Sequence, residues 1–92
     1  MSGASCTIYP NPIWRSRPNG SNPPNVTITV NGVSGKVKIP VIDLHGRVAA
    51  SETLECLGNC AQSFDVNRLA QGAYFVRITG ENVSMVRKLI VR

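Results

Sequence analysis

The chain has 92 residues, of which 42% are hydrophobic, so it is long enough for one small domain with its own core. Only 16% of the residues are charged, which is not the composition of a disordered chain, and no apolar run is long enough for a membrane span. The net charge is +5, but the basic residues are scattered, so neither a nucleic-acid partner nor direct membrane insertion is expected.

A short strand and a long loop are predicted at the beginning of the chain. The strand covers Thr7–Tyr9, and Tyr9-Pro10-Asn11-Pro12 marks its end. The loop covers Ile13–Asn25, because proline, glycine, asparagine and serine are frequent there. We expect Trp14, at the base of this loop, to cap the core, whereas an exposed tryptophan would indicate a contact site.

The next two predicted strands are Val26–Val30 and Lys36–Asp43, in which apolar and polar residues alternate. Asn31-Gly32 and Ser34-Gly35 predict a turn between them. Pro40 has no backbone N–H to donate, so we expect the second strand to lie at a sheet edge or to be bulged near this residue.

The segment from Asp43 to Arg47 predicts a type I turn, with Asp43 at its first position and Gly46 at its fourth. Gly46 is expected to take a positive φ, as a bulge. His45 is the single histidine of the chain and lies in this turn, so it is interpreted as a turn residue rather than a general base. The acidic residues are dispersed and no phosphate-binding loop is present, so no catalytic activity, metal or other cofactor is expected.

Cys56 and Cys60 flank a three-residue link at a predicted hairpin tip. This spacing favours a disulfide, which contributes about 2 kcal/mol in the chain-entropy model and indicates an oxidising compartment. Free thiols are the main alternative, and a metal site, which would have to recruit Cys6 and His45, is favoured least. Cys6 is left to pair outside this chain or to stay free.

Leu69, Gly72 and Tyr74 have the spacing of a tyrosine corner, in which a phenol hydroxyl donates to upstream backbone, so Tyr74 is interpreted as structural. A single helical turn is the only helix expected, at Asn67–Ala70. The predicted fold is therefore a seven-stranded, immunoglobulin-like antiparallel β-sandwich. Its four remaining strands are Arg47–Leu54, Ala61–Val66, Ala73–Thr79 and Val83–Val91.

Four motifs, YPNP, DLHGR, LAQGAYFVRI and the terminal KLIVR, occur in this order from Ile8 to Arg92. Together they resemble the C-terminal sorting domain of cargo proteins of the type IX secretion system. The resemblance implies a secretion signal that directs an upstream cargo domain of the same precursor through the outer-membrane translocon. No signal peptide is recognised at the N-terminus, so the precursor's own export signal is expected elsewhere.

The resemblance also implies partners and a route. The precursor would pass through the periplasm, be read by the translocon and its shuttle proteins, and reach the outer membrane and cell surface or be secreted. A cysteine-type sortase would then remove the domain. Residues 1–6 would form the linker and cleavage region, with small residues at Gly3, Ala4 and Ser5, and residues 7–92 the sorting domain.

The motif residues are carried over from the resemblance in two groups. The expected structural group is Tyr9, Pro10, Asn11, Pro12, Leu69, Gly72 and Tyr74. The expected recognition group, for which backbone pairing by the last strand is the proposed mode, is Asp43, Gly46, Arg47, Lys88, Leu89, Ile90, Val91 and Arg92. The alternative function is an accessory binding or spacer module of a surface enzyme or adhesin, which would require an exposed aromatic platform.

Overall fold

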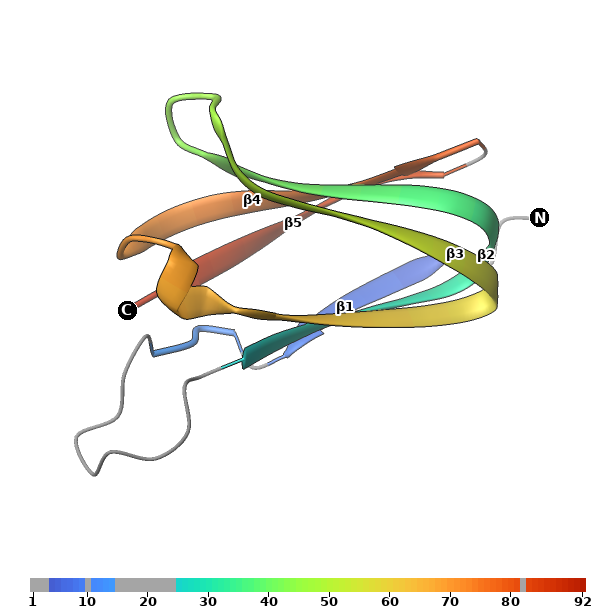
Figure 1. Cartoon of the computed structure of the whole chain (residues 1–92), viewed down its shortest axis with the longest axis horizontal. Coiled ribbons are helices and arrows are strands. Elements are labelled where there is room, and N and C mark those ends of the chain that lie inside the picture. The colour runs from blue at the N-terminus through green and yellow to red at the C-terminus, as the bar shows by residue number, and fades with distance from the viewer. Residues whose placement is uncertain (1–3, 10, 15–24, 82) are drawn as a thin grey trace.

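The computed structural model describes residues 4–9, 11–14, 25–81 and 83–92, and in these ranges the fold is all-β (Figure 1). Every strand pairing is antiparallel: β2 pairs with β1, β3 and β4, and β4 pairs with β5. None of the described residues forms a helix long and apolar enough to cross a membrane. The strands are β1 (Ser5–Tyr9), β2 (Asn25–Asp43), β3 (Val48–Asp65), β4 (Gly72–Gly80) and β5 (Ser84–Val91), and a short 3-10 helix, η1 (Val66–Arg68), precedes β4.

The long hairpin of β2 and β3 gives the molecule its shape. The two strands pair along their whole length, and both bend on the right of Figure 1, where they pass from one layer to the other. The register shifts between Asn31 and Val33, and three glycines of the bend have positive φ: Gly32 (78°), Gly35 (107°) and Gly58 (95°). The sheet therefore curls into a half-barrel, with β1 and β5 in contact at its opening.

These bends explain where the structure differs from the predicted strand count. The turn predicted at Asn31–Gly35 and the hairpin tip predicted at Cys56–Cys60 both lie inside continuous strands. The all-β, antiparallel fold is confirmed, whereas the described residues form five strands in one curled sheet. Seven separate strands and an immunoglobulin-like sandwich are not confirmed, because a bulge and positive-φ glycines turn the chain without interrupting the ladder.

Pro40 lies in the most central strand of the sheet. β2 has β3 on one side and both β1 and β4 on the other, so the prediction of an edge strand is wrong. The β2–β4 pairing runs to Lys38 and resumes at Val41, which leaves a gap at the residue that cannot donate. The alternative prediction, a bulge near Pro40, agrees with the register shift between Val41 and Ile42.

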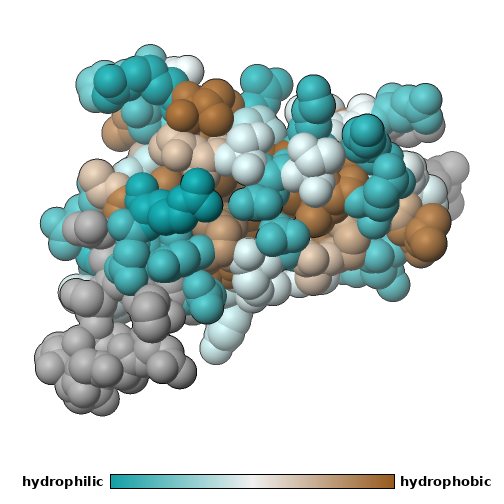
Figure 2. All heavy atoms as spheres, viewed as in Figure 1, coloured by the Kyte–Doolittle hydropathy of each residue, from teal (hydrophilic) through white to brown (hydrophobic). Residues whose placement is uncertain are grey.

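The core lies between the two layers. It is built from inward-facing side chains, which alternate with outward-facing ones along the strands. Figure 2 shows hydrophobic residues in this band, beneath a cover of hydrophilic side chains. Trp14 is 62% exposed, so the prediction that it caps the core is wrong; its neighbour Ile13 is buried instead. Tyr74, Val76 and Ile78, at alternate positions of β4, are all buried. The largest fully buried side chains are Ile28, Ile39, Leu69, Ile78, Leu89, Val26, Val30, Val37, Val41, Val66, Val76 and Val91.

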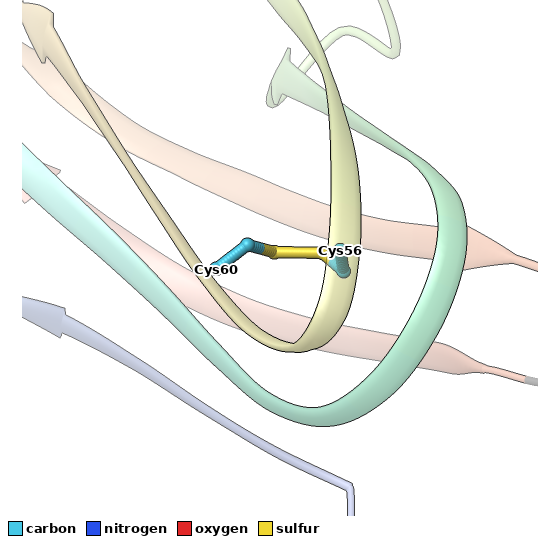
Figure 3. Close-up of a disulfide and its surroundings, with 2 residues drawn as sticks. All are labelled: Cys56 and Cys60. Carbon is cyan, nitrogen blue, oxygen red and sulfur yellow. A yellow bond between two sulfur atoms is a disulfide. The ribbon is translucent and has the colours of Figure 1, made fainter.

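The predicted disulfide between Cys56 and Cys60 is present and spans the bend of β3 (Figure 3). Cys56 is fully buried, so the bond fixes the bend against the core. Cys6 is a free, buried thiol, and burial raises its pKa, an effect that the nearby Arg87 partly opposes.

The disulfide should contribute measurably to the free energy of unfolding of the domain. Replacing both Cys56 and Cys60 with Ala is expected to lower the free energy of unfolding by about 2 kcal/mol, because the unfolded chain loses a covalent loop. Urea denaturation of the variant, of the reduced wild type and of the oxidised wild type measures the change. Equal stabilities of the oxidised and reduced wild type would contradict the expectation.

Candidate functional site

The four sequence motifs meet at one end of the molecule. Strand pairing places Asp43 of the first turn beside Tyr74, and Tyr74 beside Leu89 of the last strand. Val91 lies between Gly72 and Ile13, which directly follows the first motif. In Figure 1 the β2–β3 turn, the loop before β4 and the C-terminus are all on the left. Residues far apart in sequence therefore form one surface.

The turn between β2 and β3 has the predicted form. The backbone N–H of Gly46 donates to the carbonyl oxygen of Asp43 (3.1 Å), and Gly46 has a φ of 84°. Oδ1 of Asp43 accepts from the backbone N–H groups of His45 (2.8 Å) and Arg47 (3.0 Å). The Asp43 side chain thus holds the turn from within, a role that only a short acceptor side chain at this position fulfils.

The same carboxylate forms an ion pair across the turn. Nε of Arg47 donates to Oδ2 of Asp43 at 3.3 Å, and the Arg47 side chain is 76% exposed. The backbone N–H of Arg47 is the largest cause that lowers the pKa of Asp43, and the His45 N–H and the Arg47 charge act in the same direction. Asp43 is consequently ionised at neutral pH, and most of the Arg47 guanidinium remains open to solvent.

The predicted tyrosine corner is also formed. The phenol of Tyr74 donates to the carbonyl oxygen of Ala70 at 2.6 Å, and Leu69 is buried. Before it, Asp65 caps the short helix η1 by accepting from the N–H of Asn67 at 2.9 Å. This helix covers Val66–Arg68 and overlaps the helical turn predicted at Asn67–Ala70.

A shallow hollow of about 250 Å³ separates the turn from the tyrosine corner. Its walls are the turn residues Asp43, Leu44, His45 and Arg47 and the corner residues Ala70, Gln71, Gly72, Ala73 and Tyr74. His45 is the one histidine of the sequence, and no hydrogen bond of its ring is found among the described residues. These residues also contain no cluster of ligands able to hold a metal ion.

The first motif fastens the last strand. The Asn11 side chain donates from Nδ2 to the carbonyl oxygen of Lys88 (2.6 Å), and its Oδ1 accepts from the N–H of Ile90 (3.1 Å). Ile13 continues the contact: its N–H donates to the Ile90 carbonyl (2.9 Å), and its carbonyl accepts from the N–H of Arg92 (2.8 Å). We call this contact of Asn11 and Ile13 with residues 88–92 the clamp.

The clamp occupies the side of β5 that does not pair with β4. Asn11 and Ile13 take up the backbone groups of Lys88, Ile90 and Arg92 on this side. Backbone pairing of a partner with this part of β5 would therefore require the clamp to open. The clamp was not predicted from the sequence, although an asparagine between two prolines, followed by an apolar residue, was a signal of a fixed polar contact.

The residues of the expected recognition group differ in their exposure. Leu89 is fully buried and Val91 is 2% exposed, so both belong to the core. Lys88 and Arg92 are exposed and Ile90 is half-buried. The folded surface therefore presents the outward side chains of the last strand together with the turn residues.

The expected cleavage region is only partly described. Ser5 is the first residue of β1 and pairs with Asn31, and Ala4, directly before it, is half-buried. Gly3, Pro10 of the first motif and most of the predicted loop at 13–25 lie outside the described residues.

Comparison with known protein families identifies this chain's relatives by a family model. A family model described as "Secretion system C-terminal sorting domain" matches residues 7–92. No curated protein and no solved structure matches the chain.

The clamp should stabilise the domain and protect backbone N–H groups of the last strand from hydrogen exchange. Replacing Asn11 with Ala removes two hydrogen bonds and is expected to lower the free energy of unfolding by about 1 to 2 kcal/mol. Hydrogen exchange should show faster exchange of the Ile90 N–H. Asn11→Asp is the matched control, since it keeps the acceptor for Ile90 and loses only the donor to Lys88. Unchanged exchange of Ile90 in Asn11→Ala would show that the clamp is not formed in solution.

The Asp43 turn should make stability depend on pH. The pKa of Asp43 is lower in the folded state than its ordinary value of 3.8, so its contribution is complete above pH 3.8 and is lost as the pH falls through the folded pKa. Asp43→Asn keeps an oxygen acceptor for the turn but carries no charge. Its melting temperature is therefore expected to fall less steeply below pH 3.8 than that of the wild type. Parallel curves would contradict this assignment.

Proposed function

The chain belongs to the family of secretion system C-terminal sorting domains, and on this premise we propose that the secretion machinery reads the end of the molecule at which the four motifs meet. The domain is a type IX secretion signal, and such a signal implies export of the protein to the cell surface or the medium. The family is a secretion-signal family and not a catalytic one.

The proposed recognition surface consists of the exposed residues of the expected recognition group. Arg47, Lys88 and Arg92 supply positive charge, and Asp43 and Gly46 fix the turn that presents Arg47. Charged side chains at the margin of a contact guide the encounter and set its specificity. Leu89 and Val91 support this surface from the core, since their burial holds β5 in place.

The proposed mode of recognition is by side chains rather than by the backbone of β5. The clamp already uses the outward backbone groups of residues 88–92, and opening it would sacrifice the four hydrogen bonds between Asn11 or Ile13 and this strand. A partner that contacts exposed Lys88 and Arg92 needs no such opening. We therefore favour docking onto the folded domain.

The proposed partners are the outer-membrane translocon and its shuttle proteins, which the precursor would meet in the periplasm. The disulfide supports this route, because such bonds form and persist in oxidising compartments. We propose that a cysteine-type sortase then separates the domain from its upstream cargo. Cleavage on the N-terminal side of Ser5 would leave β1 intact, since Ser5 is the first residue paired with β2.

A second candidate is an accessory binding or spacer module. The exposure of Trp14 (62%) and Tyr9 (77%) favours it, because exposed aromatic side chains are frequent in binding surfaces. Such a module would leave export unaffected when it is deleted, whereas a sorting signal would not.

Charge reversal at Arg92 tests the recognition surface. In the full precursor, Arg92→Glu is expected to lower the exported fraction by about tenfold, the effect of losing a contact of about 1.4 kcal/mol. Arg87→Glu makes the same charge change at an exposed residue of β5 and should export normally, because Arg87 pairs with the buried Val76 and so lies on the other side of the sheet from Lys88. The amounts in periplasm, cell surface and medium are measured together with the melting temperature. Truncation of residues 88–92 is less informative, because it also removes Leu89 and Val91 from the core.

Equal export of Arg92→Glu and wild type, with both folded, would exclude a role of this charge in recognition. Normal export of a precursor that lacks residues 7–92 altogether would contradict the sorting function itself.

A further inference from the structure

The two outward faces of the curled sheet have different chemistry. One face, formed by β1 and by the parts of β2 and β3 paired with each other near β1, carries small polar side chains. There Thr27 lies opposite Ser63, and their hydroxyl oxygens are 2.9 Å apart. Its outward residues in the described chain are Ser5, Thr7, Tyr9, Asn25, Thr27, Thr29, Asn31, Asn59, Ala61, Ser63 and Asp65. None of them is basic, and this is the usual surface of a solvated sheet.

The other outward face is apolar at its centre. It is formed by the first part of β3, the last part of β2, β4 and β5, and we call it the four-strand face. Across it, Val48 lies opposite Ile42, and Ile42 lies opposite Phe75. Val48 is 61% exposed and Phe75 is 40% exposed, so both keep much of their surface in water.

On β5, Lys88 lies directly opposite Phe75, and the apolar residues Ile90 and Val86 lie on either side of Lys88. Ile90, half-buried, lies opposite Ala73, and Val86, 48% exposed, lies opposite Arg77. Contiguous exposed apolar surface is uncommon on soluble domains and marks interaction sites. The core does not account for it, because the inward neighbour Val76 is already fully buried on the other side of the sheet.

Positive charge surrounds these apolar residues. Four exposed basic residues stand on the same face: Lys36, Lys38, Arg77 and Lys88. Two carboxylates lie beside them: Glu55 is opposite Lys36, and the exposed Glu81 lines a hollow together with Lys36 and Lys38. None of the four cations is in an ion pair within the part of the chain that the structure describes. Their charges are therefore available to a partner.

We propose that the four-strand face, centred on Phe75, is the docking surface for an acidic protein surface with an apolar centre. The inference rests on the proposed function, since the partner would belong to the export machinery. Protein–protein contacts are rich in aromatic residues and arginine, and a polar rim surrounds them. Phe75, Arg77 and the lysines of this face have that composition. The excess of cations on the face selects carboxylates on the partner. Lys88 and Ile90 join this face to the motif end of the molecule, so both belong to one continuous surface.

A membrane fits this face less well than a protein does. Interfacial binding requires apolar side chains that reach about 5–10 Å into the lipid, as on one side of an amphipathic helix. Phe75 lies in a paired central region between β2 and β5 and is 40% exposed, so it does not project in this way. A paired sheet that carries cations around an apolar centre is instead complementary to a protein surface with carboxylates around an apolar centre.

Substitution of Phe75 tests the apolar centre. In the full precursor, Phe75→Glu is expected to lower the exported fraction by about tenfold or more while the melting temperature stays close to that of the wild type. The matched control is Leu57→Glu, since Leu57 is 91% exposed and lies in the bend of β3, opposite Ser34 and far along β2 from Ile42, the partner of Phe75. The control should export normally. Normal export of folded Phe75→Glu would overturn the proposal.

The charge of the face is tested separately, which keeps the proposal falsifiable if Phe75→Glu fails to fold. Arg77→Glu should lower the exported fraction about tenfold. Arg77→Lys should keep most of the wild-type export, because lysine also carries a positive charge for an acidic partner. Arg87→Glu again controls for net charge. Equal export of Arg77→Glu and Arg77→Lys would contradict the proposed acidic partner.

Two further arms separate the explanations. Purified full-length precursor is mixed with vesicles of phosphatidylglycerol and phosphatidylcholine; binding that Phe75→Glu abolishes would identify a lipid partner and overturn the proposal of a protein. Absence of vesicle binding, with the export defects above, supports it. A precursor lacking residues 7–92 that is still exported would refute the sorting function, whereas trapping of that deletion with normal export of Phe75→Glu would refute the docking face alone.

Discussion

The continuous pairing of β2 with β3 is the constraint on which the rest of the structure depends. Because both strands run through the bend without leaving the ladder, one hairpin supplies strands to both layers. Every other strand joins this frame: β1 pairs with one part of β2, and β4 pairs with another part and carries β5. The disulfide fixes the bend at the point where the sheet changes direction.

The motifs of this chain serve structure and surface at once. Asp43 and Tyr74 hold a turn and a corner by hydrogen bonds to nearby backbone, and each thereby positions neighbours that face solvent. In the last strand the division alternates, with Leu89 buried and Lys88 exposed. A single short motif can therefore specify both a stable fold and a recognisable exterior, as strand geometry places successive side chains on opposite faces.

Local chemistry was predictable from sequence, and long-range geometry was not. Alternation identified strand segments at Val26–Val30 and Lys36–Asp43. The turn at Asp43 and the corner at Tyr74 depend on hydrogen bonds between residues within five positions of each other. Glycine signals, however, are the same for a reversing turn and for a bend within a strand, so the strands were divided too often. The contact of Asn11 with Lys88, 77 positions away, leaves no periodic pattern in the sequence. The exposure of Trp14 likewise depends on how Ile13 meets the last strand.

The clamp has a consequence for the timing of folding. Translation proceeds from the N-terminus, so Asn11 and Ile13 leave the ribosome long before the backbone groups of residues 88–92 that complete their hydrogen bonds. A nascent chain that stops early lacks these groups and also lacks the buried Leu89. The complete fold therefore forms only after residues 88–92 have been synthesised. Machinery that binds only this fold would not export polypeptides that lack them.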